Sequence, residues 1–313
     1  MISPIIIVGP TAVGKTKLSI EVAKAFQGEV ISGDSMQVYK GMDIGTAKIS
    51  PKEMEGVSHH LIDIRNPDES YSVADFTEQV KEAAHQILIR GNRPIVAGGT
   101  GLYIQALLDD YQFEEKQSDS NVRLNLENEA NQLGIEHLYE RLKNIDPKEA
   151  KKIPIQNKRR IIRALEIFEL TGKTKSEWNN KESQSHIFEH SILIGLEMDR
   201  TILYDRINNR VDQMVEDGLI DEVFSFYKLG FADLQSMKGI GYKEFIPYFK
   251  GEWTKEEAID RLKRNSRRFA KRQMTWFKNK MDVQWYTISP EHYSENFQKI
   301  LDDLAGMIKE KEK

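Results

Sequence analysis

Short apolar runs alternate with amphipathic stretches over the first third of the chain. The run "PIIIV" (residues 4–8) predicts a buried strand, and "TKLSIEVAKAF" after it repeats apolar residues at helical spacing, at Leu18, Val22 and Phe26. Further strands are predicted in "EVISGDS" up to Asp34, in "HHLIDI" and in "RPIVAGGTG", with a helix through "ADFTEQVKEAAHQILIRG" before the last. Strands that alternate with helices in this way predict an α/β fold, with a parallel sheet flanked by helices on both faces.

The pattern changes after residue 112, where polar and charged helical sequence begins and continues to about residue 187. Strand character returns in "HSILIGLEMD" (190–199), and from residue 200 onward helices are predicted to the end, interrupted by the turn "MKGIGYKE". We therefore predict an α/β core with C-terminal helices (1–113 and 188–313) and a helical insertion (114–187) with a polar hinge near residues 114–120. The far boundary stays open, because the helix "NKRRIIRALEIFELTG" could pack on either part.

The loop after the first strand carries a specific local signal. Residues 9–16, "GPTAVGKT", satisfy G-x-x-x-x-G-K-[ST] between a predicted strand and a predicted helix. Glycines let backbone N–H groups converge on phosphate oxygens, and the helix N-terminus adds partial positive charge. Lys15 would neutralise a terminal phosphate, and the Thr16 hydroxyl would bind Mg²⁺. The predicted phosphate site comprises Gly9, Pro10, Thr11, Ala12, Val13, Gly14, Lys15 and Thr16.

This loop does not by itself imply ATP. A nucleotide-hydrolysing site normally holds its metal with an Asp that closes a second apolar strand. Here "PIVAGG" has glycines at that place, and Asp63 lies inside the apolar run "HLIDI". A kinase for a nucleotide or small metabolite is one alternative, which would need an adenine pocket and such an Asp. A non-catalytic RNA-binding module that senses a ligand through its loop is another.

Composition excludes some classes of protein. Of 313 residues, 39% are hydrophobic and 30% are charged, which is typical of a globular protein. No run approaches the ~18 apolar residues of a membrane span, and the opening "MISPIIIV" is too short for a signal peptide. The absence of Cys excludes disulfides and thiolate metal sites. We therefore expect a cytoplasmic protein without a membrane partner.

The charge is distributed unevenly. The net charge of −4 argues against a nucleic-acid partner, but "RLKRNSRRFAKRQMTWFKNK" (261–280) contains nine basic residues and no acidic one. Such a face can attract a polyanion locally, although it can also be an ordinary solvated helix face. Within it Leu262, Phe269 and Trp276 recur every seven residues and are expected to pack on the core. His59 and His60 have no further ligands at metal spacing, so we expect hydrogen-bonding roles for them.

Six motifs together resemble one family. They are "GPTAVGKT", "SGDSMQVYKGMDIGTAK", "HHLIDI", "VAGGTGLY", "KRRIIRALE" and "RQMTWF". In this order, over nearly the whole chain, they are similar to the bacterial tRNA dimethylallyltransferases (tRNA isopentenyltransferases). The resemblance implies a P-loop, kinase-like core with a helical insertion, and Mg²⁺ as cofactor. It also implies transfer of a dimethylallyl group from dimethylallyl diphosphate to N6 of adenosine 37, beside the tRNA anticodon. The bound phosphates would then belong to an isoprenoid diphosphate. We expect a monomer.

The resemblance suggests roles for individual residues. Arg210, in "NNRVDQM", matches the family's diphosphate-contacting Arg, and Thr16 and Asp34 complete the expected catalytic set. Asp34 is expected to be the general base for the N6 proton, although a strand-end Asp can also cap the following turn. Contacts with an extruded adenine are expected from Asp34, Ser35, Met36, Gln37 and Thr100.

Basic residues are expected to contact the RNA backbone. These are Arg123, Lys158, Arg159, Arg160 and Arg163 in the insertion, and Lys271 and Arg272 in the basic tract. We also expect the insertion to swing about its hinge and close on the anticodon stem-loop.

Overall fold

The computed structural model describes residues 2–109, 120–178 and 186–312. The chain divides into two compact units, which we call the core unit (1–108 and 187–313) and the insertion unit (109–186). The sequence placed these divisions at 113/114 and 187/188. The helix "NKRRIIRALEIFELTG", which the sequence could not place, forms α7 (Lys158–Thr171) of the insertion unit. Of the predicted hinge, residues 114–119 lie outside the described residues.

The core unit contains a six-stranded parallel sheet. In spatial order β3-β2-β4-β1-β5-β6, its strands are His59–His60, Gly28–Ser32, Arg93–Gly98, Ile5–Val8, Ile192–Glu197 and Gln284–Thr287. The central strand β1 pairs in parallel with β4 and β5, and all four of its residues are fully buried. An uninterrupted apolar run suits a strand that is covered on both faces. The parallel sheet predicted from the sequence is therefore confirmed.

One predicted strand is shorter than expected, and one strand was missed. The run "HHLIDI" forms only the two residues of β3, because Leu61 (φ 60°) and Asp63 (φ 55°) adopt left-handed backbone conformations that end the strand. The C-terminal part is also not helical throughout, since β6 pairs in parallel with β5 at the edge of the sheet. Tyr286 and Trp285 in β6 pack on opposite faces of the sheet, as the alternation of a strand requires.

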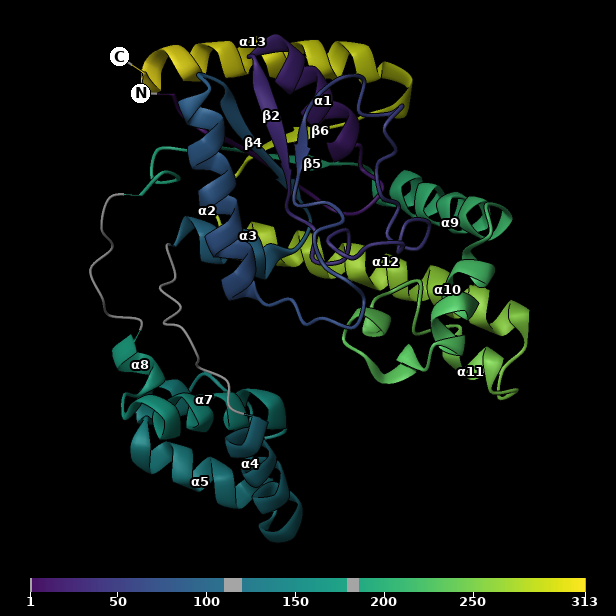
Figure 1. Ribbon diagram of the computed structural model, residues 1–313. Helices are drawn as coiled ribbons and strands as arrows, with labels where there is room; N and C mark the ends of the chain where they lie inside the picture. The colour runs from purple at the N-terminus through teal and green to yellow at the C-terminus, as the bar shows by residue number, and fades with distance from the viewer. Residues whose placement is uncertain (1, 110–119, 179–185, 313) are drawn as a thin grey trace. The chain divides into compact units, whose positions relative to one another are not determined.

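Helices cover both faces of the sheet (Figure 1). On one face, α1 (Lys15–Ala25) and α13 (Tyr293–Lys311) pack against Ile5 and Ile7. On the other, α2 (Val73–Ile89), α3 (Gly101–Leu108) and α12 (Lys255–Lys280) pack against Ile6 and Val8. Between β5 and α12 lie α9 (Arg200–Glu216), α10 (Leu219–Lys228), three-residue 3-10 helices at Phe231–Asp233 and Ser236–Lys238, and α11 (Ile246–Phe249). A further 3-10 helix, Pro290–His292, precedes α13.

The two ends of the core unit meet at the amino end of the sheet. The Ser3 N–H donates a hydrogen bond to Glu312 Oε1 at 2.8 Å, and Arg93 Nη1, at the start of β4, donates to the same oxygen at 2.8 Å. Figure 1 shows the chain ends side by side. Across the described ranges, no helix combines the length and apolarity needed to cross a membrane.

The insertion unit is a small helical bundle with its own core. It comprises α4 (Ser120–Leu133), α5 (Ile135–Ile145), α6 (Pro147–Ala150), α7 and α8 (Lys175–Trp178). Leu126, Leu138 and Leu165 from three of these helices pack together and are almost completely buried. Because this apolar cluster is complete within residues 122–165, the insertion has the packing of a separate folding unit.

Candidate active site

The phosphate loop joins β1 to α1 at the carboxyl edge of the sheet. Gly9 and Gly14 have positive φ angles of 147° and 112°, and a Cβ on Gly9 would lie 2.6 Å from the Leu196 carbonyl oxygen. Only glycine tolerates this combination of backbone angle and close approach. Lys15 Nζ donates to the carbonyl oxygens of Gly9 at 2.9 Å and Pro10 at 2.7 Å, so its ammonium group lies over the loop.

The surroundings of Lys15 and Arg210 lower the pKa values of both side chains. Burial lowers the pKa of Lys15 to about 8, Arg210 acts in the same direction, and Asp34 opposes them. Burial also lowers the pKa of Arg210, again opposed by Asp34. Two cations and one carboxylate thus face one another where the sequence predicted a site for a diphosphate.

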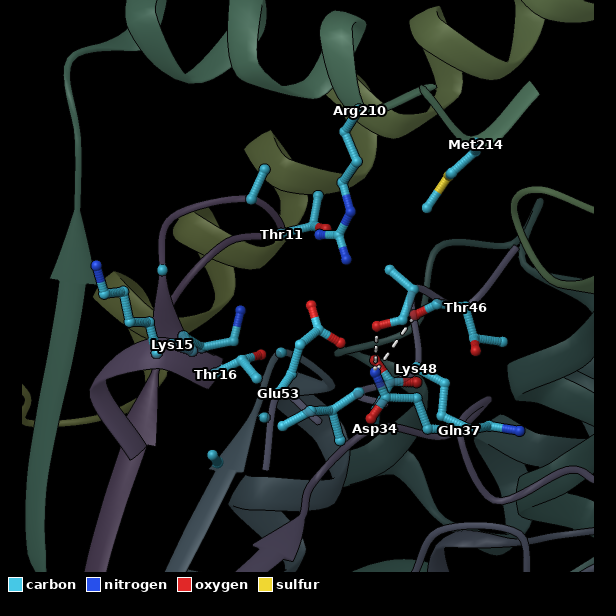
Figure 2. A pocket seen from close by; sticks show the side chains of 18 of the residues that line it. Thr11, Lys15, Thr16, Asp34, Gln37, Thr46, Lys48, Glu53, Arg210 and Met214 are labelled. Atoms are coloured by element: carbon cyan, nitrogen blue, oxygen red, sulfur yellow. Dashed lines mark hydrogen bonds between the residues drawn. The ribbon is translucent and has the colours of Figure 1, made fainter. Parts of the chain in front are cut away.

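Two cavities meet at Asp34 and Arg210. The first chamber has a volume of about 620 Å³ and is lined by Lys15 and Thr16, among others (Figure 2). The second chamber, of about 380 Å³, is lined by residues that include Ser35 and Thr100. Both chambers share Thr11, Asp34, Thr46, Ala47, Arg210, Met214 and Phe269. Asp34 and Arg210 therefore stand where a molecule in one chamber would meet a molecule in the other.

Asp34 follows β2 and makes the turn cap that the sequence left open. Its Oδ1 accepts a hydrogen bond from the Met36 N–H at 2.8 Å. This bond uses one carboxylate oxygen and fixes the side chain against the wall of both chambers. Capping and chemistry are thus compatible in one residue.

The residues predicted to contact a base divide into two groups. Ser35, Met36 and Thr100 line the second chamber with Asp34. Gln37 lines the first, and its amide is already engaged: Oε1 accepts from Ser32 Oγ at 3.1 Å, and Nε2 donates to the carbonyl oxygens of Thr46 and Ala47 at 3.3 Å each. Its visible role is to hold residues 46 and 47, which line both chambers.

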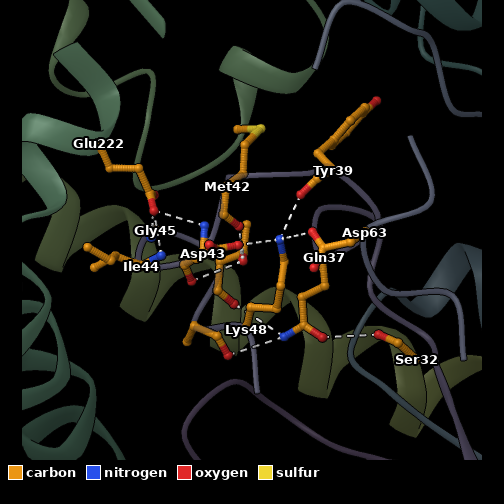
Figure 3. A network of polar contacts seen from close by, with 12 residues as sticks. Ser32, Gln37, Tyr39, Met42, Asp43, Ile44, Gly45, Lys48, Asp63 and Glu222 are labelled. Carbon is orange, nitrogen blue, oxygen red and sulfur yellow. Dashed lines mark hydrogen bonds and ion pairs between the residues drawn. The ribbon is translucent and has the colours of Figure 1, made fainter. Parts of the chain in front are cut away.

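A polar network that the sequence did not reveal holds the segment 43–48 (Figure 3). Glu222 on α10 accepts three backbone N–H bonds, from Asp43 at 2.9 Å, Ile44 at 2.8 Å and Gly45 at 3.0 Å, and a fourth bond from the Tyr242 hydroxyl at 2.6 Å. No local motif indicated this contact, since Glu222 is far from its partners in sequence.

The same segment is also held from its other end. Lys48 Nζ donates to Tyr39 O at 2.7 Å, Asp43 Oδ1 at 2.5 Å and Asp63 Oδ1 at 2.6 Å. Asp63, which the sequence considered as a metal ligand, is therefore paired with a lysine. This network holds residues 43–48, which form part of the walls of both chambers.

Arg206 is a further cation that sequence reasoning missed. It lies one helical turn before Arg210 on α9, lines the first chamber, and donates from Nε to the Ala12 carbonyl oxygen at 3.0 Å. Its i, i+4 spacing from Arg210 was the available signal, because residues so spaced share one helix face.

The predicted apolar stripe of α12 was partly wrong. Leu262 and Trp276 pack on the core, but Leu262 also lines the second chamber and Phe269 lines both chambers. Beside it, the exposed Arg272 lines the second chamber with its guanidinium 5.7 Å from the Phe269 ring centroid. Lys271 is exposed on the same helix.

The predicted RNA-contacting residues of the insertion unit form internal contacts in several cases. Lys158 Nζ donates to Asn131 at 2.6 Å, and Arg163 Nη1 donates to the buried Glu166 at 2.9 Å. Arg123 forms a pair with Glu127 at 3.4 Å and Arg160 with Glu149 at 3.8 Å, while Arg159 is exposed. All five lie outside the unit that contains the chambers.

The donor set of the first chamber suits a hard divalent cation. The Thr16 hydroxyl and the Glu53 carboxylate both line it, and hydrogen bonds from Ser50 lower the pKa of Glu53, which keeps it ionised. Oxygen donors of this kind are those that Mg²⁺ prefers. Within the described ranges no cluster of three or more His, Asp or Glu could hold a metal alone, so phosphate oxygens and water would complete the shell. The two histidines have the hydrogen-bonding roles expected from the sequence: His59 Nδ1 bonds with the Val57 carbonyl oxygen, and His60 Nε2 bonds with the Glu29 carboxylate.

Comparisons with known proteins agree with this architecture. Residues 37–280 match the sequence profile of a family described as IPP transferase. A tRNA dimethylallyltransferase of Oceanobacillus iheyensis is 53% identical over 305 residues, 97% of each chain, and one of Halalkalibacterium halodurans is 52% identical over 307 residues, 98% of each. The crystal structure of a tRNA isopentenylpyrophosphate transferase from Bacillus halodurans matches with a TM-score of 0.75 at 49% identity, covering 100% of this chain and 98% of that one. A eukaryotic dimethylallyltransferase structure, described as acting on tRNA, matches with a TM-score of 0.84 at 30% identity, over 96% of this chain and 77% of that one.

Proposed function

The chain belongs to the IPP transferase family, and from this premise we propose that its two chambers hold the two substrates of a dimethylallyl transfer to tRNA. It is a transferase that attaches a dimethylallyl group to tRNA, as its relatives are named for doing. We propose that the acceptor is N6 of adenosine 37, next to the anticodon. The observation that carries the proposal is the meeting of both chambers at Asp34 and Arg210.

The first chamber fits the diphosphate of the donor. Lys15, Arg206 and Arg210 supply positive charge, and the loop N–H groups and the α1 N-terminus add partial charge. As the bond between C1 and the bridging oxygen of dimethylallyl diphosphate breaks, negative charge develops on the leaving diphosphate. Fixed cations lower the energy of that charge in the transition state.

The second chamber fits an extruded base. The N6 amine attacks C1 of the dimethylallyl group, forms the new C–N bond, and must then lose one proton. Asp34 lies on the wall that the chambers share, so its carboxylate can accept that proton. Met36, Met214 and Phe269 supply apolar surface against which a base or a dimethylallyl group can pack. The products are diphosphate and N6-(dimethylallyl)adenosine in tRNA.

Mg²⁺ is the cofactor that this site fits. The Thr16 hydroxyl would bind it, with Glu53 as the nearby carboxylate and the diphosphate supplying further oxygens. When bound, the ion neutralises charge on the leaving diphosphate.

RNA is held, in this proposal, by basic residues of both units. Lys271 and Arg272 lie on α12, where Arg272 lines the second chamber, and Lys158 and Arg159 lie on α7. In the same proposal, these basic residues bind the anticodon stem-loop of the tRNA. The protein acts as a monomer in the cytoplasm. A P-loop kinase is less well supported, because Asp63 is paired with Lys48.

The test is a transfer assay with Mg²⁺, unmodified tRNA and labelled dimethylallyl diphosphate, with a parallel assay for phosphate release from ATP. Wild-type protein should place label on N6 of adenosine 37, located by nuclease digestion and mass spectrometry. Asp34→Asn should lose transfer about 10²- to 10⁴-fold. Asn can still accept the Met36 N–H, so this substitution separates proton transfer from turn capping.

Either of two results would overturn the proposal. Phosphate release from ATP without any prenyl transfer would place the protein among the kinases. Transfer by Asp34→Asn at the wild-type rate would show that the carboxylate is not the base.

A further inference from the structure

Gln273 connects the two loops that face the reacting groups. It lies on α12 within "RQMTWF", and its side chain is almost completely buried at 5% exposure. Its Oε1 accepts a hydrogen bond from the Thr11 N–H at 2.9 Å, and its Nε2 donates to the Gly99 carbonyl oxygen at 2.9 Å. One amide thus joins the phosphate loop to the turn that follows β4.

The two joined loops both contribute to both chambers, and Gln273 itself lines the first. Thr11 lines both chambers, Gly99 lines the first, and Thr100, the next residue, lines the second. The Thr11 N–H donates to Gln273, which leaves the N–H groups of the later loop residues to face a phosphate. Gln273 therefore acts at the junction of the chambers.

The packing around Gln273 leaves its amide little freedom. A Cβ on Gly99 would lie 2.3 Å from Gln273 Nε2, so a larger residue at position 99 would displace the Gln273 amide. One turn along α12, Trp276 Cδ1 would lie 2.4 Å from a Cβ on Gly101. The two motifs "GGTG" and "RQMTWF", which are far apart in sequence, form one closely packed joint.

We propose that Gln273 is a positioning residue for the transfer reaction, which sets the distance between the donor's C1 and the acceptor amine. This inference rests on the proposed function. The Gln273 side-chain amide provides both an acceptor for the Thr11 N–H and a donor for the Gly99 carbonyl oxygen. Without it the Thr11 end of the phosphate loop and the turn at Gly99 and Thr100 can shift relative to one another, while Lys15 and Thr16 keep their place at the start of α1. Because reaction rate depends steeply on the alignment of the reacting groups, the chemical step should respond more than binding.

Two nearly isosteric variants test the proposal in the full-length protein. Gln273→Met removes both hydrogen bonds. Gln273→Glu keeps an oxygen that can accept from the Thr11 N–H. When the new carboxyl is ionised, its second oxygen faces the Gly99 carbonyl oxygen and repels it. When the carboxyl is protonated, its O–H can donate to the Gly99 carbonyl oxygen. Burial and the facing carbonyl should both raise the pKa of this carboxyl. Gln298→Met and Gln298→Glu on the exposed face of α13 are the matched controls.

Two quantities are measured for each variant: the single-turnover rate of prenyl transfer to tRNA and the Kd of inorganic diphosphate. The thermal midpoint of each variant is also measured, to establish that the variant is folded during the assay. Gln273→Met should slow the single-turnover rate about 10- to 100-fold at all pH values, with the Kd for diphosphate changed by less than about 3-fold. The rate of Gln273→Glu relative to wild type should rise as pH falls from about 8.5 to 6, because protonation restores the donor. Both controls should match the wild type.

The proposal fails if Gln273→Met, folded under assay conditions, transfers at close to the wild-type rate. It also fails if the relative rate of Gln273→Glu is independent of pH, or if diphosphate binding weakens as much as the rate. These outcomes are distinct from failure of the proposed function, in which the wild-type protein itself would transfer no dimethylallyl group.

Discussion

Two residues of the site make structural contacts and also line the chambers. Asp34 caps a turn through Oδ1 and lines both chambers, and Lys15 covers the phosphate loop while its pKa falls toward neutral pH. A lysine with a pKa near 8 is only partly charged at mildly alkaline pH. Its charge, and the affinity that depends on it, can therefore be titrated in the accessible range.

Diphosphate binding should weaken as pH rises through about 8, which is the pKa of Lys15 in the ligand-free protein. Below that pH the ammonium is charged and this contribution is complete; above it, binding requires proton uptake, so affinity should fall up to about tenfold per pH unit. Calorimetric titration with inorganic diphosphate from pH 6.5 to 9.5 measures the effect. Lys15→Arg, whose charge does not titrate, provides the baseline for the ligand's own ionisation. Parallel pH profiles for the two proteins would contradict the prediction.

Glu29 is a second residue whose ionisation has a measurable consequence. It lies in β2, buried, and accepts from Arg90 at 2.9 and 2.8 Å, from Asn92 at 2.8 Å, and contacts His60 at 2.7 Å. Hydrogen bonds from Arg90, followed by those from Asn92 and His60, lower the pKa of Glu29 to about 2 against the opposing effect of burial. The folded state thus favours the ionised carboxylate.

Glu29→Gln should lower the free energy of unfolding by about 1 to 3 kcal/mol at pH 7, because bonds to an ionised acceptor are lost. The folded pKa is below the ordinary value of 4.5, so the stabilisation is present above pH 4.5 and is lost as pH falls toward 2. Urea unfolding of both proteins between pH 7 and 3 should therefore show a gap that narrows in acid. A gap that is constant over this range would contradict the assignment.

At the scale of elements, the sequence predicted what depends on local periodicity. The run "IIIV", the Gly-Lys-Thr loop and α1 are all specified by residues close together in the chain, and the structure places them as predicted. The truncation of β3 depends on left-handed residues at 61 and 63 that no apolar pattern reveals. Strand β6 has only four residues and is stabilised by pairing with β5, whose paired residues lie ninety positions earlier.

The site was predictable to a similar degree. Residues attached to a strand end, such as Asp34 and Thr100, could be placed from the topology, because ligands of a parallel sheet bind beyond its carboxyl ends. Glu222 and Gln273 could not, because each acts through a backbone group roughly 180 to 260 residues away in the chain. Arg206 was missed although its spacing from Arg210 indicated a shared helix face. Phe269 was assigned to the core because a helical stripe does not distinguish a core from a cavity wall.

The attachment of segment 43–48 to α10 should be sensitive to one substitution. Glu222→Gln keeps the side-chain size but replaces one acceptor oxygen by an NH₂ group that faces N–H or O–H donors. We expect loss of about 1 to 3 kcal/mol of unfolding free energy, and faster amide exchange at residues 43–45. Asp221→Asn, an exposed neighbour with the same charge change, is the control. Equal exchange in both variants would show that the carboxylate does not hold the segment.

At the scale of the whole molecule, an acidic protein presents basic residues from both of its units. The net charge is −4, yet residues 261–280 contain nine basic residues and no acidic one. Attraction of RNA by such a protein depends on local fields, which salt screens over a distance of about 8 to 10 Å. The salt dependence of binding therefore reports which residues contact phosphates.

Replacing Lys271 and Arg272 by Ala should weaken tRNA binding and make the plot of log K against log salt concentration shallower by about 1 to 2 units. Lys158→Ala with Arg159→Ala, in the insertion unit, should have a similar and additive effect. Filter binding at several salt concentrations measures both. Lys299→Ala with Lys309→Ala, exposed on α13, should leave the slope unchanged. A wild-type slope in either basic pair would remove that pair from the RNA interface.

The meeting of residues 3 and 312 at the amino end of the sheet has a practical consequence. The chambers lie at the opposite, carboxyl edge, after β1, β2 and β4. An affinity tag, a dye or a surface tether attached at either end would therefore leave the chambers open to solution. The same closeness makes the core unit suited to circular permutation, in which a short linker joins the present ends and new ones are opened in a surface loop.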